Sequence, residues 1–234
     1  MKKNIINSFL KKNIFIALIP AKGKSKSIKK KNLQKIKGKS LVNIVIENSK
    51  KSKYLKKIYI SSEDIKILKN AKNKNINPII RPKLLSNTES KMIDVIKHAK
   101  KYITKDNKNI FIVLLQPTSP FRTYRHIDKA IEVMILNKQK SLISLVKNEI
   151  CIFKSVKINK ANIKPVFSDR FLSYNRQSFP DTYMPNGAIY IFSINSINKK
   201  TQNLIDKSFM PFVMNKNESL DIDNKKDLIY ANKN

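Results

Sequence analysis

The fold is decided by residues 14–25, which read IFIALIPAKGKS. An unbroken apolar run such as 14–19, without polar alternation, is typical of a strand buried on both faces of a parallel sheet. The Pro-Ala-Lys-Gly turn that follows ends the strand and begins a polar, basic loop over residues 22–32. This stretch therefore predicts a parallel-sheet protein with a ligand-facing loop after its first strand.

Strands and helices alternate outward from this stretch to about residue 146. The apolar pattern predicts strands at 58–61, 77–80, 110–115 and 142–146, and helices at 41–49, 64–74, 92–102 and 127–136. Such alternation indicates an α/β fold with a mainly parallel sheet. Ligands of these sheets bind beyond the carboxyl ends of the strands, so the loops 20–32, 61–64, 81–90 and 116–123 should converge on one rim.

The pattern changes after residue 146. Residues 147–185 are irregular and rich in turn signals, whereas residues 188–192 form another strand and residues 228–232 end a helix. We therefore divide the chain into a basic N-terminal tail (1–13), an α/β core (14–146), an excursion (147–185) and a return to the core (186–234).

The composition is strongly basic, with a formal net charge of +33. Such a charge usually suggests nucleic acid, but lysine is spread through the chain, arginine is rare and tryptophan is absent, a bias typical of A/T-rich codons. We expect no specific nucleic-acid partner. The apolar runs are too short to span a membrane, no secretory signal is recognisable, and the single Cys151 cannot form an internal disulfide, so we expect a cytoplasmic protein.

Few residues resist this compositional bias, and they gather in motifs. Two of the three glycines, Gly23 and Gly187, lie in motifs, and Gly38 lies in a turn just after the first motif. Two of the five arginines, Arg122 and Arg176, lie in motifs as well, and Arg81 begins the loop 81–90 that follows a predicted strand.

The first motif is PAKGKSKS at 20–27, followed by Lys31 and Asn32. A loop in this place can direct backbone N–H groups and lysine ammonium groups at phosphates. The spacing of a P-loop and the glycines of a dinucleotide fingerprint are both missing. A solvated lysine-rich turn is the alternative.

Two further motifs present polar groups after strands. LLQPTSPFR at 114–122 is stiffened by two prolines, and NRQSFP at 175–180 is followed by PNGAIY at 185–190. The guanidinium group of Arg176 can pair with a carboxylate in a bidentate manner. The alternatives are a structural loop for the first and an ordinary surface arginine for the second.

The last motif is Asp221-Ile222-Asp223. Alternate residues of an extended segment point the same way, so the two carboxylates form a hard oxygen site suited to Mg²⁺. The alternative for Asp223 alone is the N-cap of the helix that follows.

Together, in this order, these motifs resemble those of the acylneuraminate cytidylyltransferases, from about Ile14 to Asp227. The resemblance implies a Rossmann-like three-layer nucleotidyltransferase fold with a mainly parallel sheet and a small dimerisation excursion that caps the partner's substrate. It also implies transfer of CMP from CTP to a nonulosonic acid, with Mg²⁺ as cofactor, by a homodimer. The stretch 186–190 favours N-acetylneuraminate or legionaminate over pseudaminate as the acceptor.

By the same resemblance, three groups of residues form the site. Catalytic roles are implied for Lys22, Lys31, Asp221 and Asp223, of which Asp221 and Asp223 bind the metal. The nucleotide is implied to contact Ala21, Lys22, Ser25, Lys26, Lys31, Asn32, Arg81 and Ser90. The sugar acid is implied to contact Gln116, Arg176, Gln177, Asn186 and Tyr190.

The chain departs from the family pattern in its first loop. Lys22 stands where the family has arginine, and Lys24 and Ser27 replace glycines, which would strain the loop if either position required a positive φ. The alternatives are an inactive synthetase, a cytidylyltransferase for pseudaminate or 3-deoxy-octulosonate, and a non-catalytic basic nucleic-acid-binding protein.

Overall fold

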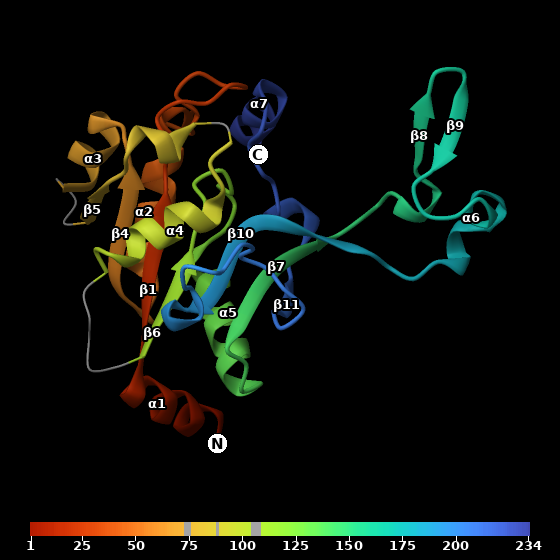
Figure 1. The fold of residues 1–234 in the computed structure, drawn as a ribbon. Helices are drawn as coiled ribbons and strands as arrows, with labels where there is room; N and C mark the ends of the chain where they lie inside the picture. Colours follow the sequence, from red (N-terminus) through yellow and green to blue (C-terminus); the bar gives the residue numbers. More distant parts are fainter. Residues whose placement is uncertain (73–75, 88, 104–108) are drawn as a thin grey trace.

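The computed structural model describes residues 1–72, 76–87, 89–103 and 109–234 and is built around one seven-stranded sheet (Figure 1). The strand order is β11-β7-β10-β6-β1-β4-β5. The strands are β1 (Asn13–Pro20), β4 (Leu55–Ser62), β5 (Asn77–Ile80), β6 (Asn109–Leu114), β7 (Ser141–Lys147), β10 (Tyr183–Ser193) and β11 (Met210–Val213). Only β10 runs antiparallel to its neighbours, so the mainly parallel sheet predicted from the sequence is confirmed.

Helices cover both faces of this sheet and give three layers. One apolar cluster joins β1 to α2 (Leu41–Lys51), α3 (Ile65–Lys72) and α5 (Tyr124–Leu136). The other joins the opposite face to α4 (Met92–Lys100) and the segment that follows β10. The strand β1 is buried along nearly its whole length, as the run 14–19 predicts, because both layers pack on it.

The structure also contains a small hairpin, a C-terminal helix and several 3₁₀ turns. A small hairpin, β2 (Lys35–Ile36) and β3 (Lys39–Ser40), turns at Gly38 with a φ of +81°. The helix α7 (Lys225–Lys233) ends the chain beside this hairpin. The 3₁₀ turns are η1 (Lys31–Leu33), η2 (Lys83–Ser86), η3 (Ile152–Lys154), η4 (Arg176–Ser178), η5 (Ile194–Ser196) and η6 (Lys216–Glu218). None of the described helices has the length and hydropathy needed to cross a bilayer.

The first residues form a helix rather than an extended tail. In α1 (Lys2–Lys12) the side chains of Ile6, Phe9 and Leu10 pack against the core. The Phe9 ring lies 6.1 Å from that of Phe15 and 5.5 Å from that of Phe111. The apolar side chains that interrupt the lysines thus make a helix face.

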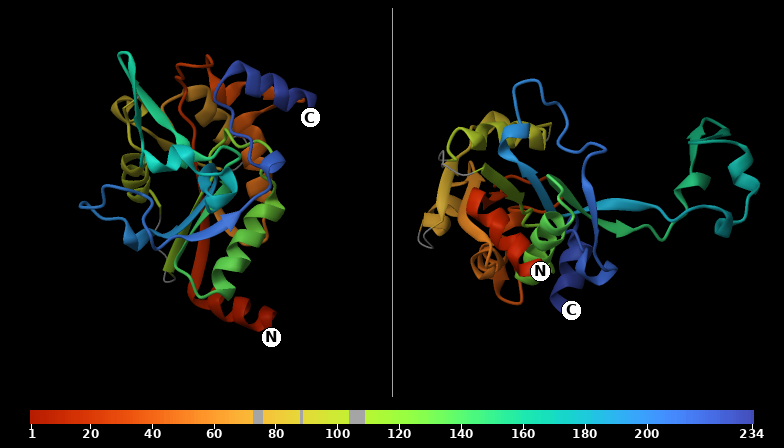
Figure 2. Two further views of the ribbon diagram at one scale, coloured as in Figure 1. Left: turned by 90° about the vertical axis from the view of Figure 1, so that its right-hand side faces the viewer. Right: turned by 90° about the horizontal axis from the view of Figure 1, so that it is seen from below.

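Residues 148–182, here called the arm, project far from the sheet (Figures 1 and 2). The ends of β7 and β10 pair to form its root, and beyond them lie the hairpin β8 (Val156–Asn159) and β9 (Asn162–Pro165) and the short helix α6 (Arg170–Ser173). No residue of 147–185 is buried, although an aromatic cluster gathers inside the arm, consisting of Phe153, Phe167, Phe171, Tyr174 and Phe179.

Candidate functional site

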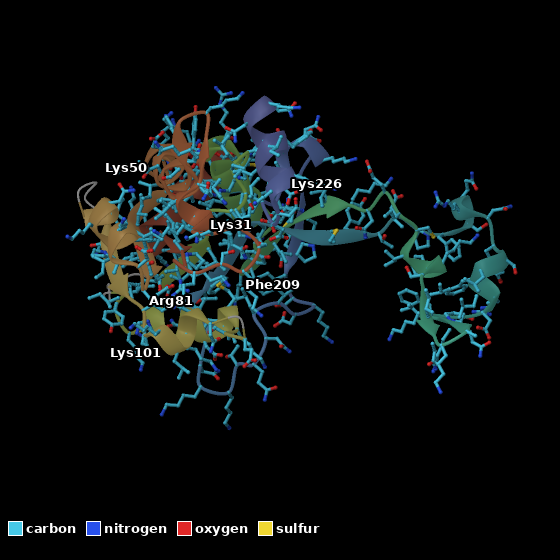
Figure 3. All side chains as sticks on the ribbon, turned by 90° about the horizontal axis from the view of Figure 1, so that it is seen from above. Lys31, Lys50, Arg81, Lys101, Phe209 and Lys226 are labelled. Carbon is cyan, nitrogen blue, oxygen red and sulfur yellow. The ribbon has the colours of Figure 1, made fainter. Side chains whose placement is uncertain are left out.

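The predicted rim holds a cavity of about 210 Å³ at the carboxyl ends of the parallel strands. Four segments that are far apart in the sequence line it: the loop after β1, the loop after β5, the loop after β6 and the segment before α7. Nine of the residues expected from the sequence meet here, namely Lys22, Ser25, Lys31, Asn32, Arg81, Ser90, Gln116, Asp221 and Asp223. Figure 3 shows Lys31 and Arg81 on the body of the protein, well away from the arm.

The lysine-rich loop after β1 is held by its own asparagine. The Nδ2 group of Asn32 donates to the carbonyl of Lys22 over 2.7 Å, which brings both ends of the loop together. The described non-glycine residues with positive φ are Lys30, Lys37, Lys138 and Lys160. Neither Lys24 nor Ser27 is among them, so the replaced glycines leave no backbone strain at these positions.

The backbone amides of this loop are used differently from what the sequence suggests. The N–H groups of Gly23 and Lys24 donate to Oε1 of Glu63, over 2.8 and 3.3 Å. Both amides are therefore engaged inside the protein and are not free to bind phosphate in this structure. The loop instead offers the cavity the side chains of Lys22 and Ser25.

Arg81 lines the cavity from the loop after β5. Its side chain is buried against the end of β4, where Nε donates to Ser61 Oγ over 3.1 Å and Nη2 donates to the Ser61 carbonyl over 2.7 Å. Burial lowers the pKa of this guanidinium group to about 10. Nearby, the Ser90 hydroxyl is hydrogen-bonded to Asn87 Oδ1 over 2.6 Å, so the loop that continues this wall is closed on itself.

The carboxylate pair reaches the cavity from the C-terminal segment. The fully buried Ile222 anchors it, and its N–H donates to the Thr118 carbonyl over 2.8 Å. Burial raises the pKa of Asp221, while a hydrogen bond with the Thr118 side chain opposes that rise. Asp223 does not cap α7, because Asn224 accepts the N–H groups of Lys226 and Asp227.

Lys31 joins the two ends of the chain. Its Nζ donates to the Ile222 carbonyl over 2.7 Å and to Asp223 Oδ1 over 3.1 Å, although the residues lie more than 190 positions apart in sequence. A lysine from the first loop and the late carboxylates therefore face each other in one cavity, which is the geometry expected from the motifs.

The carboxylates fit a divalent cation. Asp221 Oδ1 is buried and has no hydrogen-bond partner among the described residues, and a free carboxylate oxygen of this kind is a ready metal ligand. No group of three or more metal-ligating residues exists within the described part of the chain. An ion held by Asp221 and Asp223 would thus take its other ligands from water and phosphate, as Mg²⁺ commonly does.

Gly187 allows the third wall to approach closely. Its φ is +73°, and a Cβ at this position would lie 3.3 Å from Gln116 Oε1 and 3.6 Å from Asp221 Oδ2. Behind this contact, the buried Arg122 donates from Nη1 to the carbonyls of Gln116 and Ala188, both over 2.9 Å. Burial lowers the Arg122 pKa to about 9. Arg122 therefore holds the Gln116 loop against β10.

Several expected site residues do not line this cavity. Ala21 is buried, Lys26 is exposed, and Arg176 and Gln177 lie on the arm, where Arg176 borders a separate cavity of about 730 Å³. Tyr190 is buried in the sheet, and burial and the charge of Asp221 raise its pKa.

The side-chain amide of Asn186 is hydrogen-bonded inside the protein. Its Oδ1 accepts from Ser144 Oγ and from the Ala188 N–H, and its Nδ2 donates to Ser219 Oγ. Because both ends of the amide are used internally, Asn186 shapes the Gly187 turn instead of projecting toward a ligand.

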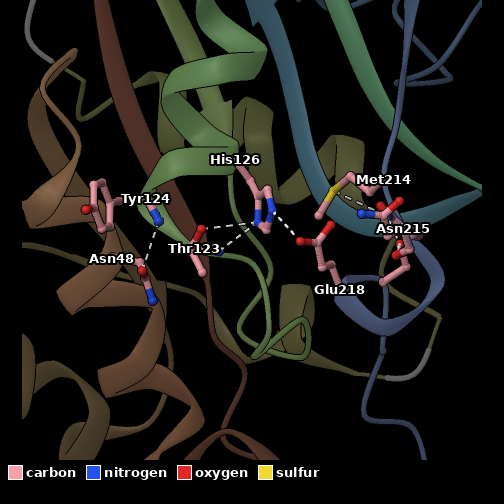
Figure 4. A network of polar contacts seen from close by, with 9 residues as sticks. Asn48, Thr123, Tyr124, His126, Met214, Asn215 and Glu218 are labelled. Carbon is pink, nitrogen blue, oxygen red and sulfur yellow. Dashed lines mark hydrogen bonds and ion pairs between the residues drawn. The ribbon is translucent and has the colours of Figure 1, made fainter.

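Sequence reasoning missed Glu63 and the pair His126–Glu218. Figure 4 shows that His126 Nδ1 accepts the Thr123 N–H at the start of α5, over 3.1 Å, while Nε2 lies 3.1 Å from Glu218 Oε1. This contact ties α5 to η6, three residues before Asp221. None of these three residues lies in a recognised motif, whereas Thr118 lies in the motif 114–122 and lines the cavity.

Comparison with known proteins agrees with this geometry. The family model described as Cytidylyltransferase matches residues 16–231. The chain is 29% identical to N-acylneuraminate cytidylyltransferase of Escherichia coli O18:K1:H7 over 92% of its length, and spans about half (51%) of that relative. It is 27% identical to pseudaminic acid cytidylyltransferase of Campylobacter jejuni serotype O:2 (strain ATCC 700819 / NCTC 11168), covering 92% of this chain and 94% of the relative.

Among solved structures, the fold is similar to CMP:2-keto-3-deoxy-manno-octonic acid synthetase complexed with CTP. The TM-score is 0.68 at 13% identity, with 94% of this chain and 97% of that chain covered, so this likeness concerns the fold. The family match spans nearly all of the sequence and includes each segment that lines the cavity. The chain therefore belongs to the cytidylyltransferase family.

Proposed function

We propose that this protein transfers CMP from CTP to the anomeric hydroxyl of a nonulosonic acid and releases pyrophosphate. The observation that carries the proposal is the meeting of Lys31 with the Asp221/Asp223 pair in a cavity that Arg81 also lines. The cations that line the cavity suit a triphosphate, and the carboxylates suit the metal that accompanies it. The similarity to relatives named for sialic and pseudaminic acids supports this class of acceptor.

The mechanism relies on positioning and charge neutralisation. Lys22 and Lys31 would hold the phosphates and offset the negative charge that develops as pyrophosphate leaves. Asp221 and Asp223 would hold Mg²⁺, which supplies Lewis-acid stabilisation of phosphate oxygens. Gln116, beside Gly187 and Asp221, would place the sugar hydroxyl in line with the α-phosphorus.

N-acetylneuraminate or legionaminate is the acceptor we propose within this class, on the strength of the stretch 186–190. The structure gives this stretch a supporting role, since Asn186 and Gly187 shape the wall that carries Gln116. Binding of a different acceptor, such as pseudaminate, would therefore involve the same wall.

The arm supports a homodimer. None of its residues is buried, and the hairpin β8–β9 exposes Ile158 by 82% and Ile163 by 63%. A two-stranded hairpin with an exposed apolar face is not expected to be stable alone. We propose that a second copy covers this face and that Arg176 of one subunit serves the cavity of the other.

The deciding experiment is a pyrophosphate-release assay with CTP and Mg²⁺. Four acceptors are compared: N-acetylneuraminate, legionaminate, pseudaminate and 3-deoxy-octulosonate. We expect turnover with one of the first two, and a loss on the order of 100-fold when Asp221→Asn and Asp223→Asn are combined, because two carboxylate ligands disappear. Normal release by that double variant would exclude the metal site.

Absence of turnover with all four acceptors would contradict the proposed activity. The nucleic-acid-binding alternative is then tested directly, because it predicts tight binding to DNA or RNA that falls steeply with salt.

A further inference from the structure

Glu63 lies behind the lysine-rich loop, at the turn between β4 and α3. Its Oε1 atom accepts two successive backbone N–H groups, from Gly23 over 2.8 Å and from Lys24 over 3.3 Å. Successive amides that converge on one oxygen form the kind of concave site that binds anions in many proteins. In this protein the anion is a carboxylate of the chain itself.

The residues of this contact are not among those that line the cavity. Lys22 and Ser25 line the cavity, whereas Gly23, Lys24 and Glu63 do not. The two hydrogen bonds to Glu63 therefore fix the backbone between Lys22 and Ser25, the two residues that line the cavity.

Glu63 also connects this loop to Arg81. Its second oxygen, Oε2, is buried and has no hydrogen-bond partner among the described residues. The charge of Glu63 raises the pKa of the Arg81 guanidinium, in opposition to the larger lowering effect of burial. One carboxylate thus acts on both walls of the cavity.

The loop needs such an anion when no ligand is bound. Lysines occupy positions 22, 24, 26, 29, 30 and 31, and like charges so close together repel one another. Asp223 pairs with Lys31 at one end of this run. Glu63 supplies the negative charge at the other end, through charge-assisted hydrogen bonds, which are stronger than neutral ones.

Gly23 leaves the loop little freedom to move off Glu63. A Cβ on Gly23 would lie 2.6 Å from both Cβ and Oδ2 of Asp64, so the backbone here is in close contact with the residue after Glu63. Asp64 is itself fixed, because its Oδ1 accepts the Lys66 N–H over 2.8 Å at the start of α3.

We propose that Glu63 is a positioning residue that occupies the anion site formed by the Gly23 and Lys24 amides and so orients Lys22 and Ser25 toward the cavity. The consequence for CTP rests on the proposed function: removal of the carboxylate should weaken binding of the triphosphate by disordering its lysines, although it makes the loop more positive.

The first test needs no substrate. Hydrogen exchange is measured at the Gly23 and Lys24 amides in the wild type, Glu63→Ala, Glu63→Gln and the control Glu47→Gln. The control removes the same charge from Glu47 on α2, which forms an exposed ion pair with Lys39. We expect exchange about 10-fold faster or more in Glu63→Ala, an intermediate effect in Glu63→Gln, whose Oε1 still accepts, and no change in the control.

Wild-type exchange at both amides in Glu63→Ala would overturn the proposal, whatever the enzyme's activity. If Glu63→Ala does not fold, as judged by a urea titration, Glu63→Gln carries the test. Loss of the charge alone should accelerate exchange at both amides, and unchanged exchange in that variant would equally refute the role.

The second test measures steady-state kinetics with CTP for the same variants. We expect the KM for CTP to rise about 10-fold in Glu63→Ala with a smaller change in kcat, and to recover in part in Glu63→Gln. Tighter CTP binding by Glu63→Ala would overturn the proposal, because it would show that the carboxylate competes with the phosphates. If the wild type does not use CTP, the proposed function fails, while the exchange result still decides the role of Glu63.

Discussion

Asp221 is the residue whose surroundings matter most for the proposed chemistry. It is a partly buried carboxylate with one unpaired oxygen, and burial raises its pKa while Thr118 and Lys31 act in the opposite direction. Because only the ionised carboxylate binds a metal ion well, a raised pKa means that metal binding weakens at a higher pH than for an ordinary aspartate.

Removal of the Thr118 hydroxyl should move this pH dependence to higher pH. In Thr118→Val the hydrogen bond that lowers the Asp221 pKa is lost, so the carboxylate becomes protonated at higher pH. We expect the acid limb of kcat/KM to move to higher pH and the Mg²⁺ requirement near pH 6 to increase. The measurement is a pH–rate profile at several Mg²⁺ concentrations, with Thr201→Val as a control outside the cavity. An acid limb unchanged from wild type contradicts this assignment.

Gly187 and Gly38 allow a comparison of two glycines with positive φ, only one of which contacts the site. Both have positive φ, but a Cβ at Gly187 would meet Gln116 and Asp221, whereas a Cβ at Gly38 would have no neighbour within 4 Å. Either change to alanine should destabilise the fold by about 1 kcal/mol or more through the backbone alone. We expect only Gly187→Ala to lose activity as well. Urea titrations and the pyrophosphate assay separate these effects, and equal losses of activity would contradict the predicted contact.

At the scale of elements, the site depends on links between segments that lie far apart in the sequence. His126 joins the start of α5 to η6, so the loop that carries Gln116 and Thr118 and the segment that carries Asp221 are held on one support (Figure 4). Because Nδ1 accepts the Thr123 N–H, the proton of the neutral ring is on Nε2, and this N–H group donates a hydrogen bond to Glu218 Oε1.

Replacement of Glu218 tests this link. Glu218→Ala removes the acceptor and should raise the Mg²⁺ concentration for half-maximal activity by about 10-fold, because the Asp221 segment loses its support. Glu218→Gln keeps an oxygen that accepts from Nε2 and should remain close to wild type. Magnesium activation curves with thermal melts provide the measurement, and equal impairment of the two variants would argue against the link.

At the scale of the whole molecule, we propose that a complete site needs the arm of a second subunit. Arg176 is on the arm and outside the cavity, while the lysines and carboxylates belong to the sheet domain. If the arm of one copy serves the other, each site combines two subunits.

Mixing of two inactive variants tests this arrangement. Arg176→Ala damages the arm, and Asp221→Asn damages the cavity. After the subunits are unfolded and refolded together in equal amounts, half of the dimers contain both variants and one of their two sites is intact. We expect about a quarter of wild-type activity in the mixture. A mixture no more active than either variant alone would show that the sites are not shared, and sedimentation of Ile158→Asp would report on the dimer itself.

The sequence determined the local features of this protein. The apolar run 14–19 predicted the central strand, the helical patterns placed α2 to α5 within a few residues, and the four motifs identified most of the residues that line the cavity. These predictions succeeded because periodicity and turn chemistry depend on neighbours along the chain. The short strand β11 and the hairpin of the arm were not predicted, since they carry little periodicity and lie outside the strand–helix alternation that indicated the equally short β5.

Only the tertiary structure decided how groups distant in sequence use one another. It directed the Gly23 and Lys24 amides to Glu63 instead of the cavity, engaged Asn186 internally, turned the first residues into a packed helix and brought Lys31 to Asp223. The physical reason is that many partners in the sequence are chemically suitable for a given hydrogen-bond donor or charged group. Which partner it pairs with depends on which groups the packed sheet brings within about 3 Å.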